Sequence, residues 1–249
     1  MYASYHNHTK RCRHATGTDE EYLIAAIRAG YKIFGFSDHA PHAFRPCYSS
    51  RGRMGMDELS KYVEGIRSLG EKYKNDITVR IGLEAEYLPA LFAEDCRLYS
   101  GAGVEYLVLG QHVLGNESLE KTVDCFAKTT DPTILTKYAD TVVAAVGTGK
   151  FSFVAHPDVL NIETDPDFYR QEADRIIRAA KRANIPLEVN LQGVMDGRNY
   201  PNPLFWERAR LLGADVILGI DAHSPELVSG GGALDLAYRF IEKHQLNER

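Results

Sequence analysis

Short apolar runs alternate with amphipathic segments along the chain, and this pattern recurs about seven times. The runs have the length of buried strands, because strands of a parallel sheet read as nearly continuous apolar stretches. We predict strands at roughly 2–7, 32–36, 77–83, 106–109, 151–155, 187–190 and 215–220. Strands that alternate with helices predict a parallel sheet covered by helices.

The segments between these runs carry the spacing and the boundary residues of helices. One helix is indicated by apolar residues that recur every three or four positions. They are Met56, Leu59, Val63, Ile66, Leu69 and Tyr73. Thr18 and Glu21 form a capping-box pattern at the start of another helix. Further helices are predicted near 90–101, 131–146, 165–180, 202–212 and 236–241.

A residue of a metal-binding type follows most of the predicted strands. These residues are His39, Glu84, His112, His156, Asp221 and His223. In a closed α/β barrel the carboxyl ends of all strands meet at one mouth, whereas the outer strands of an open sheet lie far apart. The pattern therefore favours a closed barrel, with residues 1–249 forming a single domain.

The first predicted strand ends in two histidines, His6 and His8. In a strand, residues two apart point to the same face, so these two imidazoles can bind one metal ion. A third histidine, His14, follows in the next loop. One such pair is weak evidence, since a buried histidine with a hydrogen-bond partner is a common core residue. Repetition of the pattern at later strands favours metal binding, and nitrogen and oxygen ligands suit zinc, iron or manganese.

Composition and charge narrow the class of protein. The chain of 249 residues has 25% charged residues and a net charge of −5, which argues against nucleic acid as a general partner. No run of about 18 apolar residues indicates a membrane span, and the N-terminus lacks the features of a signal peptide. The 4 cysteines are widely spaced, as is typical of reduced thiols. We expect a cytoplasmic protein that does not bind membranes, and bound metal ions would still attract an anionic substrate.

Taken together, the motifs resemble those of the PHP (polymerase and histidinol phosphatase) family over essentially the whole chain. They are His6-x-His8, His14, Asp38-His39, Gly82-x-Glu84, His112, His156 and Asp221-x-His223. The resemblance implies a distorted (β/α)7 barrel with three divalent metal ions. It assigns His6, His8, Glu84 and Asp221 to the first ion, Glu84, His112 and His156 to the second, and His14, His39 and His223 to the third.

Two further motifs, Met54-x-Met56 and Arg198-Asn199-Tyr200-Pro201, resemble the histidinol-phosphate phosphatase branch. The branch implies hydrolysis of L-histidinol phosphate to L-histidinol and phosphate in histidine biosynthesis, with a hydroxide that bridges two metal ions as nucleophile. The alternatives are another PHP phosphatase or phosphoesterase, acting on nucleotides or other phosphate esters, and a non-catalytic metal-binding barrel. Loss of ligands would indicate the last of these, and none of the expected ligands is missing.

Candidates for contact with the substrate lie in the loops that follow the strands. Lys10, His42 and Arg53 are expected to bind substrate at the barrel mouth, although solvated loop positions are an alternative. Arg198 is expected to bind phosphate oxygens in a fork and to stabilise charge in the transition state. Asp38 is a candidate acid for the leaving group, or it orients the neighbouring imidazole.

Two assignments in these loops have competing interpretations. Glu86 would share the strand face of Glu84 if the strand continued, and it is an alternative metal ligand. The glycine run 230–232 lacks the Lys and Ser/Thr of a P-loop, and we interpret it as a flexible connection that interrupts the last helix.

Overall fold

The computed structural model describes residues 2–119 and 121–249. The chain forms two compact units. Unit 1 consists of Met1–Val108 and Ile220–Gly231, and unit 2 consists of Leu109–Gly219 and Gly232–Arg249. A single domain over 1–249 therefore stays a prediction. Within the described residues, no helix is long and apolar enough to cross a membrane.

The strands of unit 1 follow one another in chain order. They are β1 (Ala3–Ser4), β2 (Ile33–His39), β3 (Thr78–Ala85) and β4 (Tyr106–Leu109). β1 and β3 both pair with β2 in parallel. The register of β2 and β3 places His39 opposite Glu84. Two predicted ligands therefore lie side by side at the carboxyl ends of neighbouring strands.

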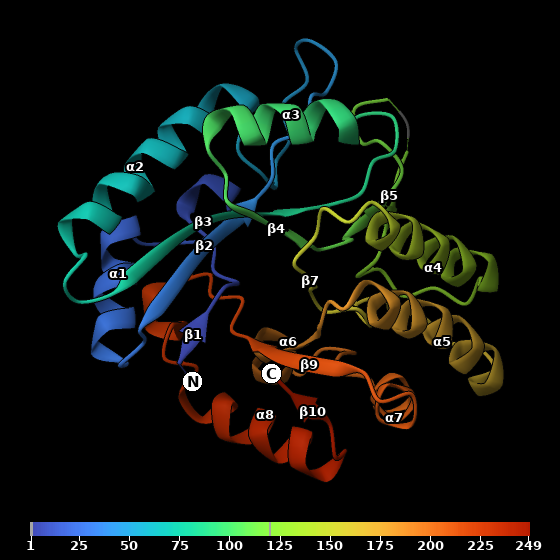
Figure 1. Cartoon of the computed structure of the whole chain (residues 1–249). Coiled ribbons are helices and arrows are strands. Elements are labelled where there is room, and N and C mark those ends of the chain that lie inside the picture. The colour runs from blue at the N-terminus through green and yellow to red at the C-terminus, as the bar shows by residue number, and fades with distance from the viewer. Residues whose placement is uncertain (1, 120) are drawn as a thin grey trace. The chain divides into compact units, whose positions relative to one another are not determined.

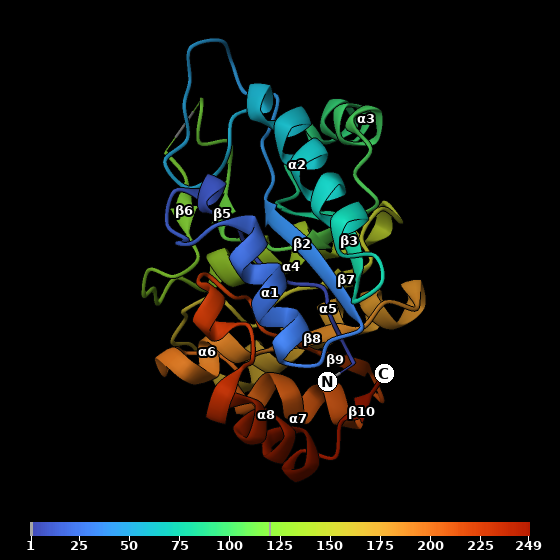
Figure 2. The same ribbon diagram turned by 90° about the vertical axis from the view of Figure 1, so that its left-hand side faces the viewer.

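Helices of unit 1 cover this sheet on one side. They are α1 (Asp19–Arg28), α2 (Leu59–Lys72) and α3 (Phe92–Ala102), with short 3-10 helices at Lys10–Cys12, Met56–Glu58 and Pro225–Leu227. Figures 1 and 2 show α1 and α2 on the same side of β2 and β3. The predicted capping box is confirmed, because the Thr18 side chain accepts from the backbone of Glu21 while the Glu21 side chain accepts from that of Thr18. Of the predicted apolar stripe, Leu59, Val63 and Ile66 are buried in α2, whereas Met56 precedes the helix and Leu69 and Tyr73 are only partly buried.

Tyr106 joins three neighbouring segments beneath the strand ends of unit 1. Its hydroxyl donates to the backbone oxygens of Tyr5 at 2.7 Å and Phe36 at 3.2 Å. The ring occupies space left by Gly35 and Gly82, since a Cβ at either position would overlap the tyrosine. The glycine of the Gly82-x-Glu84 motif thus makes room for a buried aromatic ring two residues before the acid.

Replacement of Gly82 by alanine is expected to lower the free energy of unfolding by about 1–3 kcal/mol, because extra volume in a packed interior forces side chains and backbone to move. Urea denaturation measures this change. Gly101 in α3 is the matched control, since a Cβ there meets no atom within 4 Å. A Gly82→Ala protein as stable as the wild type would show that Tyr106 can move away without cost.

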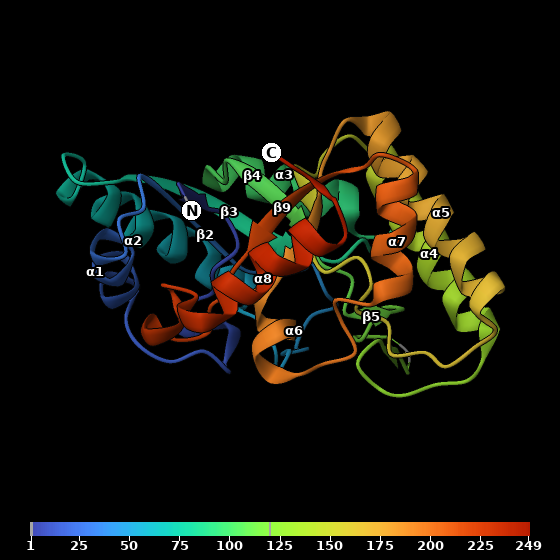
Figure 3. The same ribbon diagram turned by 90° about the horizontal axis from the view of Figure 1, so that it is seen from below.

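Unit 2 contains four strands in parallel order and a small hairpin. The strands are β7 (Phe153–Val154), β8 (Leu187–Asn190), β9 (Asp215–Gly219) and β10 (Asn247–Glu248), in that order, and β5 (Val113–Leu114) pairs with β6 (Val123–Asp124). The helices are α4 (Pro132–Gly147), α5 (Pro166–Ala183), α6 (Leu191–Asp196), α7 (Pro203–Leu211) and α8 (Gly231–Lys243). Figure 3 shows α4, α5 and α7 side by side, in agreement with their contacts.

The regular strands differ in length from the predicted runs. β1 ends at Ser4 instead of near residue 7, and Asn7 forms an isolated parallel bridge with Ala222. The Asn7 side chain donates to Gly35 O at 2.9 Å, which keeps the segment attached to β2. β3 instead continues through Glu84 to Ala85. The predicted strand 151–155 is reduced to the two residues of β7.

Two expected connections are helical. The segment after β8, predicted as a loop, forms α6, because the Asn190 side chain accepts from Gly193 N and caps the first turn. The glycine run, interpreted as a flexible interruption, instead precedes and begins α8. Gly230 and Gly231 have positive φ values of 69° and 47°, which glycine adopts readily, so they form the turn into the helix.

Candidate metal centre

Two distant segments of unit 1 bring the first ligands together. His8 N donates to Ala222 O at 3.0 Å, and Asp221 N donates to His6 O at 2.9 Å. The segment after β9 therefore runs beside the segment after β1. Asp221 has a φ of 56°, in the left-handed region that aspartate tolerates better than most residues. The two backbone bonds hold Asp221 beside the His-x-His motif.

The side chains of His6, His8 and Asp221 converge on one point. One potential ligand atom from each lies within 4.8 Å of the others. His8 Nε2 is 2.9 Å from Asp221 Oδ1 and 3.3 Å from His6 Nε2. Glu84 joins this group, with its Oε1 3.4 Å from His6 Nε2 and its Oε2 3.5 Å from His8 Nε2. His6 and His8 thus face the same point, although neither lies in a regular strand, and their role as ligands stays a prediction.

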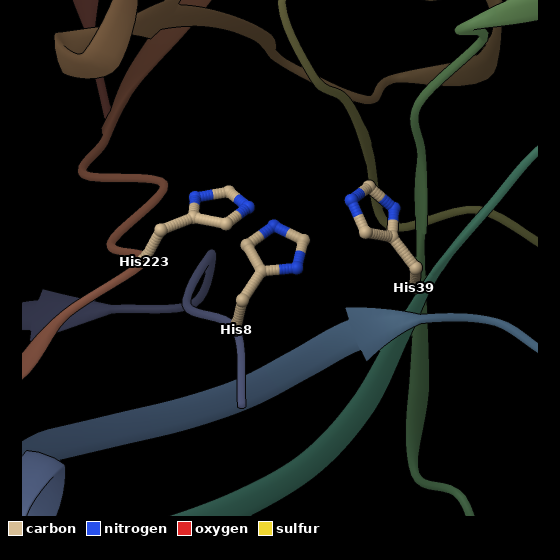
Figure 4. Close-up of side chains that lie close together, drawn as sticks. All are labelled: His8, His39 and His223. Atoms are coloured by element: carbon tan, nitrogen blue, oxygen red, sulfur yellow. The ribbon is translucent and has the colours of Figure 1, made fainter. Parts of the chain in front are cut away.

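A second cluster of imidazoles adjoins the first. His8, His39 and His223 can each direct a nitrogen to a common site, again within 4.8 Å. Figure 4 shows their rings close together. The His8 and His223 rings stack with centroids 4.1 Å apart, and the His8 and His39 rings lie 4.4 Å apart. His14 Nε2 is 3.1 Å from His223 Nε2. The Cys12 sulfur also lies within 4.8 Å of nitrogens of His14 and His223, a position that the sequence did not indicate.

Backbone oxygens fix the orientation of two of these rings. His14 Nδ1 lies 2.8 Å from Cys12 O, and His223 Nδ1 lies 3.0 Å from Asp221 O. In each ring the Nδ1 proton is therefore held by the backbone, and Nε2 is left to face the cluster. Metal-binding histidines use their second nitrogen in this manner.

Asp38 lies beneath the ligands and contacts several of them. It is fully buried, its Oδ1 accepts from His39 N at 2.8 Å and lies 3.4 Å from His8 Nδ1, and its Oδ2 accepts from the Thr9 hydroxyl. These contacts support the interpretation that Asp38 orients an imidazole, here that of His8. Its alternative role as an acid for the leaving group stays a prediction.

The electrostatics of the cluster resemble those of a cation site. Burial alone would lower the pKa of His8, but hydrogen bonds to Asp221 and Asp38 raise it to about 9. Burial would raise the pKa of Asp221, but His6, His8 and His223 hold it well below its usual range. The carboxylates thus stabilise positive charge at this point, whether a proton or a metal ion carries it.

The imidazoles of His14 and His223 are held in the neutral form. Burial and then the charge of His8 lower the pKa of His14, and the same causes lower that of His223 to about 3. Neutral imidazoles and ionised carboxylates are the forms that bind metals. The buried nitrogen and oxygen donors of unit 1 therefore fit divalent metal ions.

His42 and Arg53 occupy a buried ionic network. His42 Nδ1 is 2.7 Å from Asp95 Oδ2, and its Nε2 is 3.2 Å from Glu86 Oε2. The Arg53 guanidinium donates to both oxygens of Glu86, at 2.6 and 2.9 Å. The alternative that these residues occupy solvated loop positions is therefore wrong, and the sequence could not reveal their buried acidic partners. Their contact with a substrate stays a prediction, whereas Lys10 is exposed.

The place of Glu86 also bears on the choice of ligand in β3. Its two carboxylate oxygens bind Arg53 and His42, while those of Glu84 face His6, His8 and His39. Glu84 is therefore the better candidate ligand.

Three predicted site residues lie in unit 2. The rings of His112 and His156 have centroids 5.0 Å apart, and His156 is buried. The Arg198 guanidinium donates to Asp196 Oδ2 at 2.8 Å and to the Tyr200 hydroxyl at 3.0 Å. It also lies over the Phe126 ring. Two imidazoles and a held guanidinium are thus present in unit 2, and their predicted roles stay predictions.

Sequence reasoning missed several supporting residues. Asp95 had a weak signal, because it falls between Phe92 and Tyr99 on the buried stripe of α3, where a charge requires a partner. Thr9 follows His8 directly but carries no signal of its own. Its role depends on Asp38, which is far away in the sequence.

Comparison with known proteins adds to this geometry. The profile of the family described as PHP domain matches residues 4–192. A protein of Deinococcus radiodurans named "Probable histidinol-phosphatase" is 27% identical over 229 residues, which cover 88% of this chain and 85% of that protein.

Two crystal structures share the fold. The hisK protein of Listeria monocytogenes gives a TM-score of 0.75 at 18% identity, covering 93% of this chain and 99% of that chain. The histidinol phosphate phosphatase of Lactococcus lactis, complexed with zinc, L-histidinol and phosphate, gives a TM-score of 0.73 at 18% identity, covering 99% of this chain and 95% of that chain. These similarities confirm the predicted fold class, the distorted (β/α)7 barrel.

Proposed function

Because the chain belongs to the PHP family, we propose that it is a metal-dependent phosphomonoesterase that hydrolyses L-histidinol phosphate to L-histidinol and phosphate. The observation that carries the proposal is the convergence of His6, His8 and Asp221, with Glu84 beside them, in one buried group. The relative named as a histidinol-phosphatase over most of both chains supports the choice of substrate. So does the fold shared with an enzyme that was crystallised with L-histidinol and phosphate.

The metal complement that we propose is three divalent ions, with zinc, iron or manganese as candidates. In unit 1 the ligands would be His6, His8, His14, His39, Glu84, Asp221 and His223, and in unit 2 His112 and His156 would supply imidazoles. Bound divalent ions lower the pKa of a coordinated water towards about 7 and stabilise charge on a phosphate. Within the chain, Asp38 would hold the His8 ring in place through Nδ1. The backbone oxygens of Cys12 and Asp221 would hold His14 and His223.

The proposal is tested by metal analysis of the purified protein together with a panel of phosphate esters. We expect bound divalent metal and the highest kcat/KM on L-histidinol phosphate, with much lower values on nucleotide and sugar phosphates. Chelation should abolish turnover and lower the melting temperature, because a ligand that binds only the folded state stabilises it. Preference for nucleotides would favour the other phosphoesterase function, and metal binding without turnover on any ester would favour a non-catalytic barrel.

Replacement of Arg198 by lysine should lower kcat/KM for L-histidinol phosphate about tenfold, equivalent to about 1.4 kcal/mol. We expect Arg198 to bind two phosphate oxygens, and an ammonium group replaces such a fork poorly. Asp196 and Tyr200 already hold the guanidinium in one orientation. Arg182→Lys on the exposed face of α5 is the control. Equal steady-state constants for Arg198→Lys and the wild type would remove Arg198 from the phosphate site.

A further inference from the structure

His156 has an unusual backbone conformation. Its φ is 27°, a positive value that residues other than glycine rarely adopt. The residue follows β7 directly and is 1% exposed. Strained conformations of this kind persist only where surrounding groups hold them. The position of the His156 imidazole therefore depends on whatever fixes this peptide.

The peptide is held on both sides. Its N–H donates to Glu188 Oε2 at 3.1 Å, and its C=O accepts from Val159 N at 3.0 Å. The same Glu188 oxygen accepts from Asn190 Nδ2 at 2.9 Å. Glu188 is a fully buried carboxylate in β8. A buried charge is costly to keep unless donors such as these stabilise it.

The neighbouring strand leaves room for this carboxylate. Gly219 in β9 lies opposite Asn190 in the register of β8 and β9. A Cβ at Gly219 would overlap Glu188 Oε1 and crowd the rest of the carboxylate. Gly219 has no positive φ, so space is the reason for glycine here. Glycine on one strand thus allows a buried acid on the next to reach the His156 peptide.

We propose that Glu188 is a positioning residue, which holds His156 in its left-handed conformation so that the imidazole can bind a metal ion, and that Gly219 is required to admit it. The inference rests on the proposed function, in which His156 is a metal ligand. The carboxylate acts through the His156 backbone and contributes no ligand atom itself.

Zinc titration of the metal-free full-length protein tests this role without reference to turnover. Loss of a residue that orients a metal ligand weakens metal affinity about 10–100-fold. We expect Glu188→Ala to show this loss at one site per chain, and His156→Ala to weaken the same site. Glu188→Gln keeps an oxygen that can accept both bonds and should restore affinity to within a few-fold of the wild type.

Glu172→Ala is the matched control. Glu172 is also a carboxylate of unit 2, 7% exposed, but it binds Arg175 within α5. Glu172→Ala should lower the free energy of unfolding and leave zinc affinity unchanged. If it weakened zinc binding as much as Glu188→Ala, the effect would be general destabilisation and the positioning role would be wrong.

Gly219→Ala provides an independent test that leaves Glu188 in the sequence. The new methyl group should displace the carboxylate and weaken zinc binding at the same site. In the Glu188→Ala/Gly219→Ala double variant the crowding is gone, so zinc affinity should be no lower than in Glu188→Ala alone. Such non-additivity is the signature of two residues that act through one contact.

Two outcomes would overturn the proposal. One is wild-type zinc affinity and stoichiometry in Glu188→Ala, or, if that variant does not fold, in Gly219→Ala. The other is full additivity in the double variant. Failure of the proposed function would look different, because a wild-type protein that does not hydrolyse L-histidinol phosphate can still be titrated with zinc.

Discussion

Replacement of Glu84 by alanine is expected to lower kcat/KM for L-histidinol phosphate by about a thousandfold or more, equivalent to at least about 4 kcal/mol of transition-state stabilisation. The two oxygens of Glu84 face different ligands. Oε1 is 3.4 Å from His6 Nε2, whereas Oε2 is 3.1 Å from His39 Nδ1. A carboxylate whose two oxygens face different groups can contact two cations at once, and that the second cation is the one expected at His112 and His156 stays a prediction. Its loss should therefore disturb more than one ion.

The measurement combines steady-state kinetics at saturating metal with metal analysis of the same preparation. Glu71→Ala on the exposed face of α2 is the control for removal of a glutamate. Glu71→Ala should leave both kcat/KM and the metal content of the protein unchanged. If Glu84→Ala kept near-normal turnover at saturating metal, the bridging assignment would be wrong.

The second large effect concerns stability. Replacement of Arg53 by methionine should lower the free energy of unfolding by about 3 kcal/mol or more, because removal of one partner leaves the other charge buried. The Arg53 and Glu86 side chains are 8% and 1% exposed, and they form a two-pronged ion pair. His42 still contacts Glu86 and should limit the loss. Urea denaturation measures the change.

A surface pair supplies the control for this variant. Arg97 and Glu94 also form a two-pronged pair, but their side chains are 68% and 50% exposed. Arg97→Met should cost less than about 1 kcal/mol, as is usual for exposed pairs. The double variant Arg53→Met/Glu86→Leu should recover part of the lost stability, since no buried charge then lacks its partner. Equal losses of unfolding free energy for Arg53→Met and Arg97→Met would show that burial does not make the Arg53–Glu86 pair more important for stability.

Much of the site could be predicted because its signals are local. His6 and His8 are two residues apart, and Glu84 lies at the end of an apolar run, so spacing was sufficient to select them as candidates. The same holds for the Thr18 capping box, which is complete within four consecutive residues.

The supporting contacts could not be predicted, because they join residues that are distant in the sequence. The partners of His42 are Asp95 and Glu86, and that of the His156 peptide is Glu188. The sequence around these residues does not indicate which charged side chain each of them contacts. The helix α6 was missed for a different reason, since a side-chain cap from Asn190 overrides a glycine-containing sequence that resembles a loop.

The pairing of residues 6–8 with residues 221–222 has a consequence for biosynthesis. A nascent chain that has emerged from the ribosome only as far as β9 contains His6 and His8 but lacks Asp221 and the backbone groups that bond to this segment. The two segments close a loop of more than 200 residues, which delays their contact relative to local structure. The candidate metal group of His6, His8 and Asp221 is therefore complete only after Asp221 has emerged, so the N-terminal histidines await their carboxylate partner during most of the synthesis of the residues between them.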